Sequence, residues 1–135
     1  MIKPIPRSLV VKLLAEAQKS PEMEVCGLIG ADHGVASAIY PVPNIAPHPE
    51  VLFEMDPGEQ IRAMRKIRES GEQLWAIYHS HPHAPATPSK KDLTDADYAD
   101  ALYLVISLNT EGVLEMRGYQ LEGDKFTETA LETME

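Results

Sequence analysis

The sequence predicts a mixed α/β domain in which a single sheet carries helices packed against it. Short apolar runs typical of strands are interspersed with segments of helical periodicity. These segments do not follow a regular strand–helix alternation, so a doubly wound parallel sheet is not expected. A length of 135 residues fits one domain that spans residues 1–135.

A first helix is predicted to begin at Ser8, whose side chain suits an N-terminal cap. The apolar residues that follow fall on one face at helical spacing: Leu9, Leu13, Leu14 and Ala17. The Ser20-Pro21 dipeptide ends this helix, because proline restricts the residue before it to extended backbone. Two strands are then predicted over 25–30 and 35–40, joined by a hairpin turn at 32–34.

Four prolines between residues 41 and 49 indicate an irregular loop, and the apolar run 51–55 is predicted to be a short strand. A second helix begins at Asp56-Pro57, which offers a capping side chain and a proline at the first helical position. Gly71 ends that helix.

The C-terminal half continues with a strand over 74–81 and a loop that contains several prolines. A short helix is predicted to begin at Ser89, and the nearly continuous apolar run 102–108 suits a central strand. The remaining segments are a turn at 109–112 and a closing hairpin with strands at 113–121 and 125–131.

Composition excludes several classes of function. The formal net charge of −9 opposes binding to a phosphate backbone, so nucleic acid is not expected as a partner. A single cysteine excludes an intrachain disulfide and fits a reducing compartment. No signal peptide and no apolar stretch of membrane-spanning length is present, so we expect a cytoplasmic protein with no membrane association.

The chemistry centres on His79-Ser80-His81 near the end of a predicted strand. Alternate residues of a strand share a face, so both imidazoles point the same way and form half of a zinc site. A His-x-His pair on its own also occurs as ordinary histidines at a strand end. The segment that follows therefore decides between these interpretations.

Stiffened by prolines, the loop after His81 leads to Ser89 and Asp92 at a helix start. Ser89-x-x-Asp92 fits a capping box, in which the two side chains satisfy backbone N–H groups. The same pattern fits equally well a site in which Asp92 is a carboxylate ligand of a metal. The two interpretations are partly compatible, because an aspartate in the first turn of a helix can also face the strand end. Exposed N–H groups at this helix start favour developing negative charge.

Two histidines and one aspartate supply three protein ligands, whereas structural zinc sites usually have four. The open position suits a water molecule, which zinc acidifies to a pKa of about 7. Such a site needs a general base, and Glu24 is the candidate because it leads directly into an apolar strand. Glu22 is its rival but lies nearer to the Pro21 turn.

Cys26 and His83 offer alternative chemistry. Cys26 lies two residues beyond Glu24 and could be a fourth ligand or a nucleophile, although a buried and inert cysteine is more common. His83 could complete a three-histidine site, but Pro82 interrupts the strand between it and His81.

Together, Glu24 in MEVCGLIG, the HSHP sequence at 79–82 and Ser89-x-x-Asp92 resemble the JAMM motif of the MPN-domain metalloproteases. The spacing from His81 to Ser89 also matches, and the resemblance extends to FEMDP at 53–57 and LYLVISL at 102–108. It implies an MPN or cytidine-deaminase-like fold with a partly barrel-like mixed sheet and flanking helices. It further implies that His79, His81 and Asp92 bind Zn²⁺, that Glu24 is the acid/base, and that Ser89 stabilises the oxyanion.

The resemblance also implies a substrate class. Proteins of this family cut amide or isopeptide bonds after the C-terminal Gly-Gly of ubiquitin or ubiquitin-like proteins, and this compact chain resembles those that process sulfur-carrier proteins. Its partner is therefore expected to be a ubiquitin-like or sulfur-carrier protein. Three alternatives remain: a general small-peptide metallohydrolase, a non-catalytic binding module of the same fold, and a hydrolase that uses Cys26.

Overall fold

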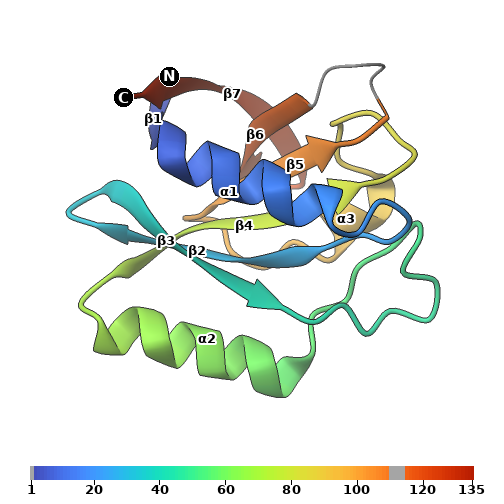
Figure 1. Ribbon diagram of the computed structural model, residues 1–135, viewed down its shortest axis with the longest axis horizontal. Coiled ribbons are helices and arrows are strands. Elements are labelled where there is room, and N and C mark those ends of the chain that lie inside the picture. The colour runs from blue at the N-terminus through green and yellow to red at the C-terminus, as the bar shows by residue number, and fades with distance from the viewer. Residues whose placement is uncertain (1, 110–114) are drawn as a thin grey trace.

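The computed structural model describes residues 2–109 and 115–135 (Figure 1). Within these residues, strands and helices follow one another in the order β1 Ile2–Pro6, α1 Arg7–Gln18, β2 Cys26–Asp32, β3 Val35–Val42, α2 Pro57–Glu69, β4 Gln73–His81, α3 Lys90–Thr94, β5 Leu102–Ser107, β6 Glu115–Glu122 and β7 Lys125–Met134. No helix of this described part is long and apolar enough to cross a membrane.

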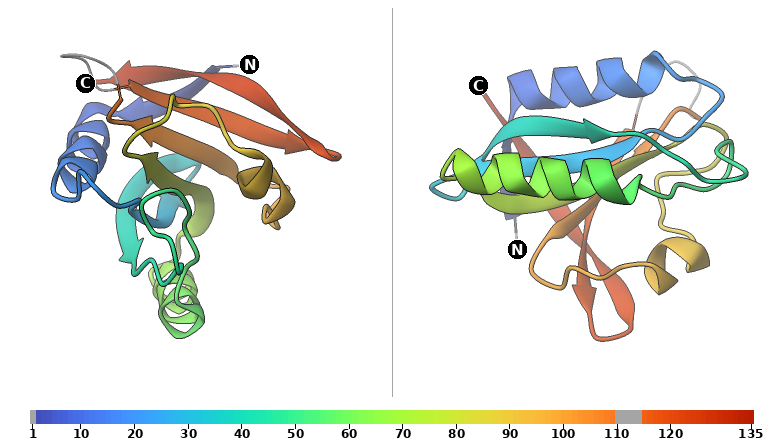
Figure 2. Two further views of the ribbon diagram at one scale, coloured as in Figure 1. Left: turned by 90° about the vertical axis from the view of Figure 1, so that its right-hand side faces the viewer. Right: turned by 90° about the horizontal axis from the view of Figure 1, so that it is seen from below.

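All the strands belong to one mixed sheet, in the order β1-β7-β6-β5-β4-β2-β3. The pairs β1–β7 and β4–β5 are parallel and the other neighbouring pairs are antiparallel. The sheet is curved enough that its two edge strands, β1 and β3, contact each other and α1 (Figure 2). The predicted single mixed sheet, partly barrel-like with flanking helices, is confirmed.

Two apolar cores lie on opposite faces of the sheet. The first packs α1 against one face through Leu9, Leu13 and Ala17. The second packs α2 against the other face through Ala63 and Ile67. Side chains of β4 alternate between these cores, and this alternation places the histidines of 79–81 on the α2 side of the sheet.

The predicted start of the first helix is wrong. α1 begins at Arg7, Ser8 lies inside its first turn, and Pro6 occupies the capping position without a side-chain hydrogen bond. Residues 2–6 form strand β1, which the sequence analysis did not predict. Pro4 and Pro6 lower the strand propensity of this segment, but β1 lies at an edge of the sheet, where a proline is tolerated.

The predicted strand over 51–55 is also wrong. Its one strand-like contact in the described chain is an isolated bridge between Asn44 and Met55. The Asn44 side chain donates to the Leu52 carbonyl and accepts from the Glu54 N–H. The hydrogen bonds that a neighbouring strand would supply to these two groups are therefore made by a side chain.

The other elements agree with the prediction within a residue or two, except that β7 extends to Met134, three residues beyond the predicted end at 131. Residues 113–114 of the predicted strand 113–121 lie outside the described part of the chain. Asp56 caps α2 by accepting a hydrogen bond from the Glu59 N–H at 3.1 Å. Gly71 follows the helix with φ of 76°, a value that favours glycine. The closing hairpin turns at Gly123, whereas residues 110–112 of the predicted turn lie outside the described part of the chain.

Candidate active site

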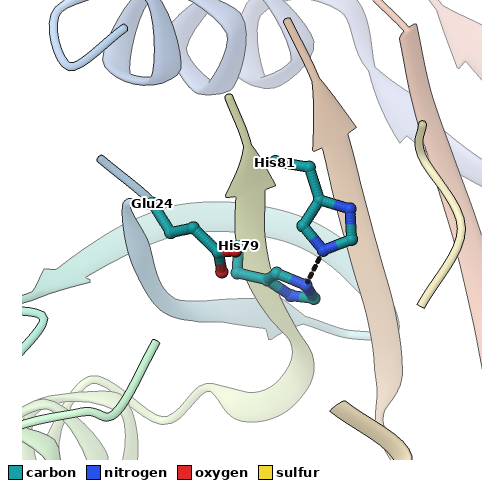
Figure 3. A group of neighbouring side chains, drawn as sticks. All are labelled: Glu24, His79 and His81. Atoms are coloured by element: carbon teal, nitrogen blue, oxygen red, sulfur yellow. Dashed lines mark hydrogen bonds between the residues drawn. The ribbon is translucent and has the colours of Figure 1, made fainter. Parts of the chain in front are cut away.

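The two histidines of β4 meet at the end of the strand. His79 and His81 are 2% and 5% exposed, and their Nε2 atoms lie 3.1 Å apart (Figure 3). β4 is held on both sides, because His79 is paired with Cys26 of β2 and with Val105 of β5. The imidazoles therefore project from a rigid central strand.

Asp92, in the first turn of α3, completes a three-residue cluster with these histidines. Its Oδ2 atom lies 3.0 Å from His79 Nε2 and 3.3 Å from His81 Nε2. The same oxygen accepts a hydrogen bond from the Ser89 N–H at 2.8 Å, while Ser89 Oγ accepts one from the Asp92 N–H at 3.0 Å. The predicted capping box is therefore present, and it directs the Asp92 carboxylate toward the two imidazoles.

These three ligand atoms fit a divalent cation. Four ligands placed tetrahedrally at 2.0–2.1 Å from zinc are about 3.3 Å from one another, close to the separations seen here. His81 Nδ1 lies 2.8 Å from the Pro85 carbonyl, so it carries the proton and leaves the Nε2 lone pair free. Burial lowers the pKa of His79, which favours the neutral ring that a metal ion requires.

The charge of Asp92 also suits a cation site. Burial opposes ionisation of this carboxyl, but the neighbouring imidazoles of His79 and His81 and the Ser89 N–H outweigh burial. They hold the pKa of Asp92 well below its usual range, and the carboxyl is therefore a carboxylate at neutral pH.

Glu24 approaches the histidines from the segment that leads into β2 (Figure 3). A carboxylate oxygen of Glu24 and one ring nitrogen of each histidine lie within 4.8 Å of one another. The side chain is 4% exposed, and its Oε1 atom has no hydrogen-bond partner among the described residues. Burial raises the pKa of Glu24 from 4.5 to about 7, a value suited to exchanging protons near neutral pH.

Ser80, between the two histidines, fixes the chain next to Glu24. Its Oγ atom accepts a hydrogen bond from the Val25 N–H at 2.8 Å, and its own N–H donates to the Val25 carbonyl at 3.0 Å. This role of Ser80 was not predicted from the sequence. A signal was available, because the middle residue of His-x-His in a central strand is expected to be buried. A buried serine hydroxyl needs a hydrogen-bond partner, and Ser80 is fully buried.

The rival base and the rival three-histidine site lie outside the cluster. Glu22 and His83 have side chains that are 80% and 59% exposed, and they pair with each other at 3.4 Å. Neither belongs to the group formed by Glu24, His79 and His81.

Cys26 is buried in the apolar core, where its Sγ atom donates to the Val42 carbonyl at 3.3 Å. Burial raises the pKa of this thiol to about 12, so very little thiolate is present at neutral pH. This environment is that of an inert structural cysteine.

A cavity of about 590 Å³ opens beside the cluster, with His79 and Asp92 in its wall. Apolar side chains such as Met55 and Phe126 line much of it, and the Phe53 ring stacks on His79 with 4.4 Å between centroids. A volume of this size accommodates a short peptide segment or a small ligand. The site therefore combines three convergent ligand atoms that could hold a cation, a buried carboxyl of raised pKa and an adjoining cavity.

Comparison with known proteins places the chain in a family. A family model described as prokaryotic homologs of the JAB domain matches residues 6–119. The chain belongs to this family, which confirms the resemblance to MPN-domain proteins.

Individual relatives span most of the chain. A desampylase from Haloferax volcanii is 32% identical over 117 residues, which cover 85% of this chain and 81% of that protein. A CysO-cysteine peptidase from Mycobacterium tuberculosis is 28% identical over 128 residues, which cover 94% of this chain and 88% of that protein. The solution structure of a protein from Desulfitobacterium hafniense matches with a TM-score of 0.86 at 30% identity, covering 100% of this chain and 94% of that chain.

Proposed function

We propose that this protein is a zinc-dependent peptidase or isopeptidase. It hydrolyses the amide bond that follows the C-terminal Gly-Gly of a ubiquitin-like or sulfur-carrier protein. The observation that carries the proposal is the convergence of three ligand atoms, 3.0–3.3 Å apart, beside the buried Glu24 carboxyl. The names of two relatives, desampylase and CysO-cysteine peptidase, support both the reaction and the class of substrate.

His79, His81 and Asp92 are the proposed zinc ligands. Two imidazole nitrogens and one carboxylate oxygen are a donor set that suits Zn²⁺. When bound, zinc supplies Lewis acidity, which acidifies water and polarises a substrate carbonyl. Because the described cluster offers three ligands from this chain, one position stays available for water or substrate.

Glu24 is the proposed general base and acid. Its carboxylate takes a proton from the attacking water and then delivers that proton to the leaving amine. Burial raises the pKa of this carboxyl to about 7 in the metal-free protein, so its carboxylate is a stronger base than that of an exposed glutamate. The absence of a bonded partner for Oε1 within the described chain leaves this atom available to the water.

Ser89 is the proposed oxyanion donor. Its Oγ atom accepts the Asp92 N–H in the capping box, and this bond uses a lone pair and leaves the hydroxyl proton available. Donation from that hydroxyl stabilises the negative charge that develops on the carbonyl oxygen in the tetrahedral intermediate.

The proposed partner is a carrier protein with an extended Gly-Gly tail, and the reaction takes place in the cytoplasm. Two glycines let the tail backbone approach the cluster closely, because they have no side chains to clash with its walls. The cavity beside His79 gives room for the substrate residues that adjoin the Gly-Gly. The acidic net charge and the single cysteine support a partner other than nucleic acid and a reducing compartment.

The test combines metal analysis with a cleavage assay on a ubiquitin-like carrier that bears a C-terminal extension after Gly-Gly. We expect one zinc per chain and release of the extension. Glu24→Gln is expected to keep the metal and lose hydrolysis, whereas Asp92→Ala loses both. The exposed Glu22→Gln change is the matched control and leaves cleavage unchanged.

Each alternative function has a distinct outcome in this assay. Equal cleavage of short unrelated peptides would indicate a general small-peptide hydrolase. Bound zinc and carrier binding without any cleavage would indicate a non-catalytic module of the same fold. Cleavage that survives chelation but not thiol alkylation would indicate chemistry at Cys26.

A further inference from the structure

We propose that Asn44 is a positioning residue that fixes Glu24 relative to the two histidines. The inference rests on the proposed function, since it assigns Asn44 to the support of the general base. Asn44 follows β3 at the start of the proline-rich loop and is not part of the JAMM motif.

The Asn44 side chain uses its full hydrogen-bonding capacity. Its Nδ2 atom donates to the Glu24 carbonyl at 3.0 Å and to the Leu52 carbonyl at 2.9 Å. Its Oδ1 atom accepts the N–H groups of Ala46 and Glu54, each at 3.0 Å. An amide has two donor hydrogens and two acceptor lone pairs, so all four are engaged. This side chain thus joins the main chain of Glu24 to the loop between β3 and α2, at Ala46 on one side and at Leu52 and Glu54 on the other.

The position of the Glu24 carboxyl depends on these main-chain contacts. Its Oε1 atom has no partner among the described residues, so the side chain is not anchored at its tip. The main chain of Glu24 is instead held from the loop, by Asn44 and by the bond from its own N–H to the Pro49 carbonyl at 2.7 Å. Loss of the Asn44 donors would free the Glu24 carbonyl on the loop side.

The loop that Asn44 folds also reaches the metal cluster. It carries Phe53, next to Glu54, and the Phe53 ring stacks on His79 at an interplanar angle of 22°. Asn44 therefore links the main chain of the proposed base to the loop segment that carries the aromatic ring stacked on His79. A displacement of about 1 Å at a reacting group lowers rates by about 100-fold, so this connection bears on turnover.

Asn44→Asp is the sharpest test, because it removes both donors while it keeps the shape of the side chain and the acceptor for Ala46 and Glu54. We expect kcat on the carrier substrate to fall about 10- to 100-fold, with KM within about threefold and zinc content unchanged. In a Glu24→Gln background, the same substitution should produce no further loss of the residual rate. Asn44→Ala provides a second variant if the aspartate protein does not fold.

Hydrogen exchange measured by mass spectrometry supplies a readout that does not depend on activity. Exchange at the Glu24 amide, which donates to the Pro49 carbonyl of the loop that Asn44 folds, should accelerate in Asn44→Asp and Asn44→Ala. Exchange at the Ala46 and Glu54 amides should accelerate strongly only in Asn44→Ala. The control is Asp56→Ala, which removes the side-chain cap of α2 but none of the hydrogen bonds that Asn44 or Glu24 makes, and it should leave kcat unchanged.

Unchanged exchange at Glu24 in both Asn44 variants would overturn the inference. An equal loss of kcat in Asp56→Ala, or a further loss on top of Glu24→Gln, would also overturn it. Failure of the proposed function has a different signature: the wild-type protein binds zinc but releases no product. The exchange data then still decide whether Asn44 holds Glu24 in place.

Discussion

Glu24→Gln should stabilise the metal-free protein at high pH while it abolishes hydrolysis. Burial raises the pKa of Glu24 from 4.5 to about 7, so the folded state binds this proton more tightly than the unfolded chain. Stability therefore falls as the pH rises from about 4.5 to 7, because ionisation in the folded state is unfavourable. Glutamine cannot ionise, so the Glu24→Gln variant does not lose this stability as the pH rises.

The size of the effect follows from the same values. At about 1.4 kcal/mol per pKa unit, the difference between 4.5 and about 7 sets an upper limit of about 3.5 kcal/mol. Relaxation of the protein and water penetration around the ionised carboxylate reduce this figure, and we expect a gain of about 1–3 kcal/mol at pH 8. Near pH 4.5 the two proteins should be almost equally stable.

The assay is urea unfolding of chelator-treated wild type and Glu24→Gln at both pH values. Chelation is required because a bound cation would favour the ionised carboxylate. Glu22→Gln, at an exposed position, should change the stability at neither pH. A difference between wild type and Glu24→Gln that does not vary with pH, or a less stable variant at pH 8, would refute the assignment of a buried carboxyl with a raised pKa.

Further predictions concern the ligands, the strand between them, and the cysteine. His81→Ala should lose most bound zinc, and with it hydrolysis, as measured by metal analysis and carrier cleavage; full zinc occupancy would remove His81 from the ligand set. Ser80→Ala should destabilise the protein by about 1–3 kcal/mol, because the Val25 N–H loses its partner, and it should retain zinc; an unchanged urea midpoint would contradict this. Cys26→Ser should keep hydrolysis within about twofold, and complete loss in a folded, zinc-bound variant would revive a catalytic cysteine.

Local patterns predicted the parts of the site that depend on neighbouring residues. The shared face of His79 and His81 follows from the two-residue period of a strand, and the Ser89–Asp92 capping box follows from the period of a helix. That Asp92 joins the two histidines was a hypothesis based on the ligand number of zinc sites, and the resemblance to a known motif supported it. Composition and periodicity alone do not determine how far Asp92 lies from β4.

Contacts between distant segments could not be predicted from local patterns. Asn44 bonds carbonyl and N–H groups at positions that carry no sequence signature, and Pro85 contributes a backbone carbonyl to His81. A backbone group can be supplied by any residue, so its role leaves no trace in the sequence. The roles assigned to the site residues remain predictions, whereas the positions of their side chains are features of the structure.

The two errors in the fold have the same origin. Strand β1 contains Pro4 and Pro6, which argue against a strand unless an edge position in the sheet is known. The apolar segment 51–55 has strand-like composition, but the Asn44 amide takes up its main-chain groups. In both segments, tertiary context outweighed local propensity.

The central claim is that three side chains of this protein bind zinc and leave a coordination position open next to Glu24. A crystal structure of the zinc-loaded protein, with the metal located by its anomalous scattering, tests it directly. We expect one zinc bound by His79 Nε2, His81 Nε2 and Asp92 Oδ2, with a solvent oxygen as the remaining ligand. Direct coordination by Glu24 or Cys26, or zinc bound elsewhere, would contradict it.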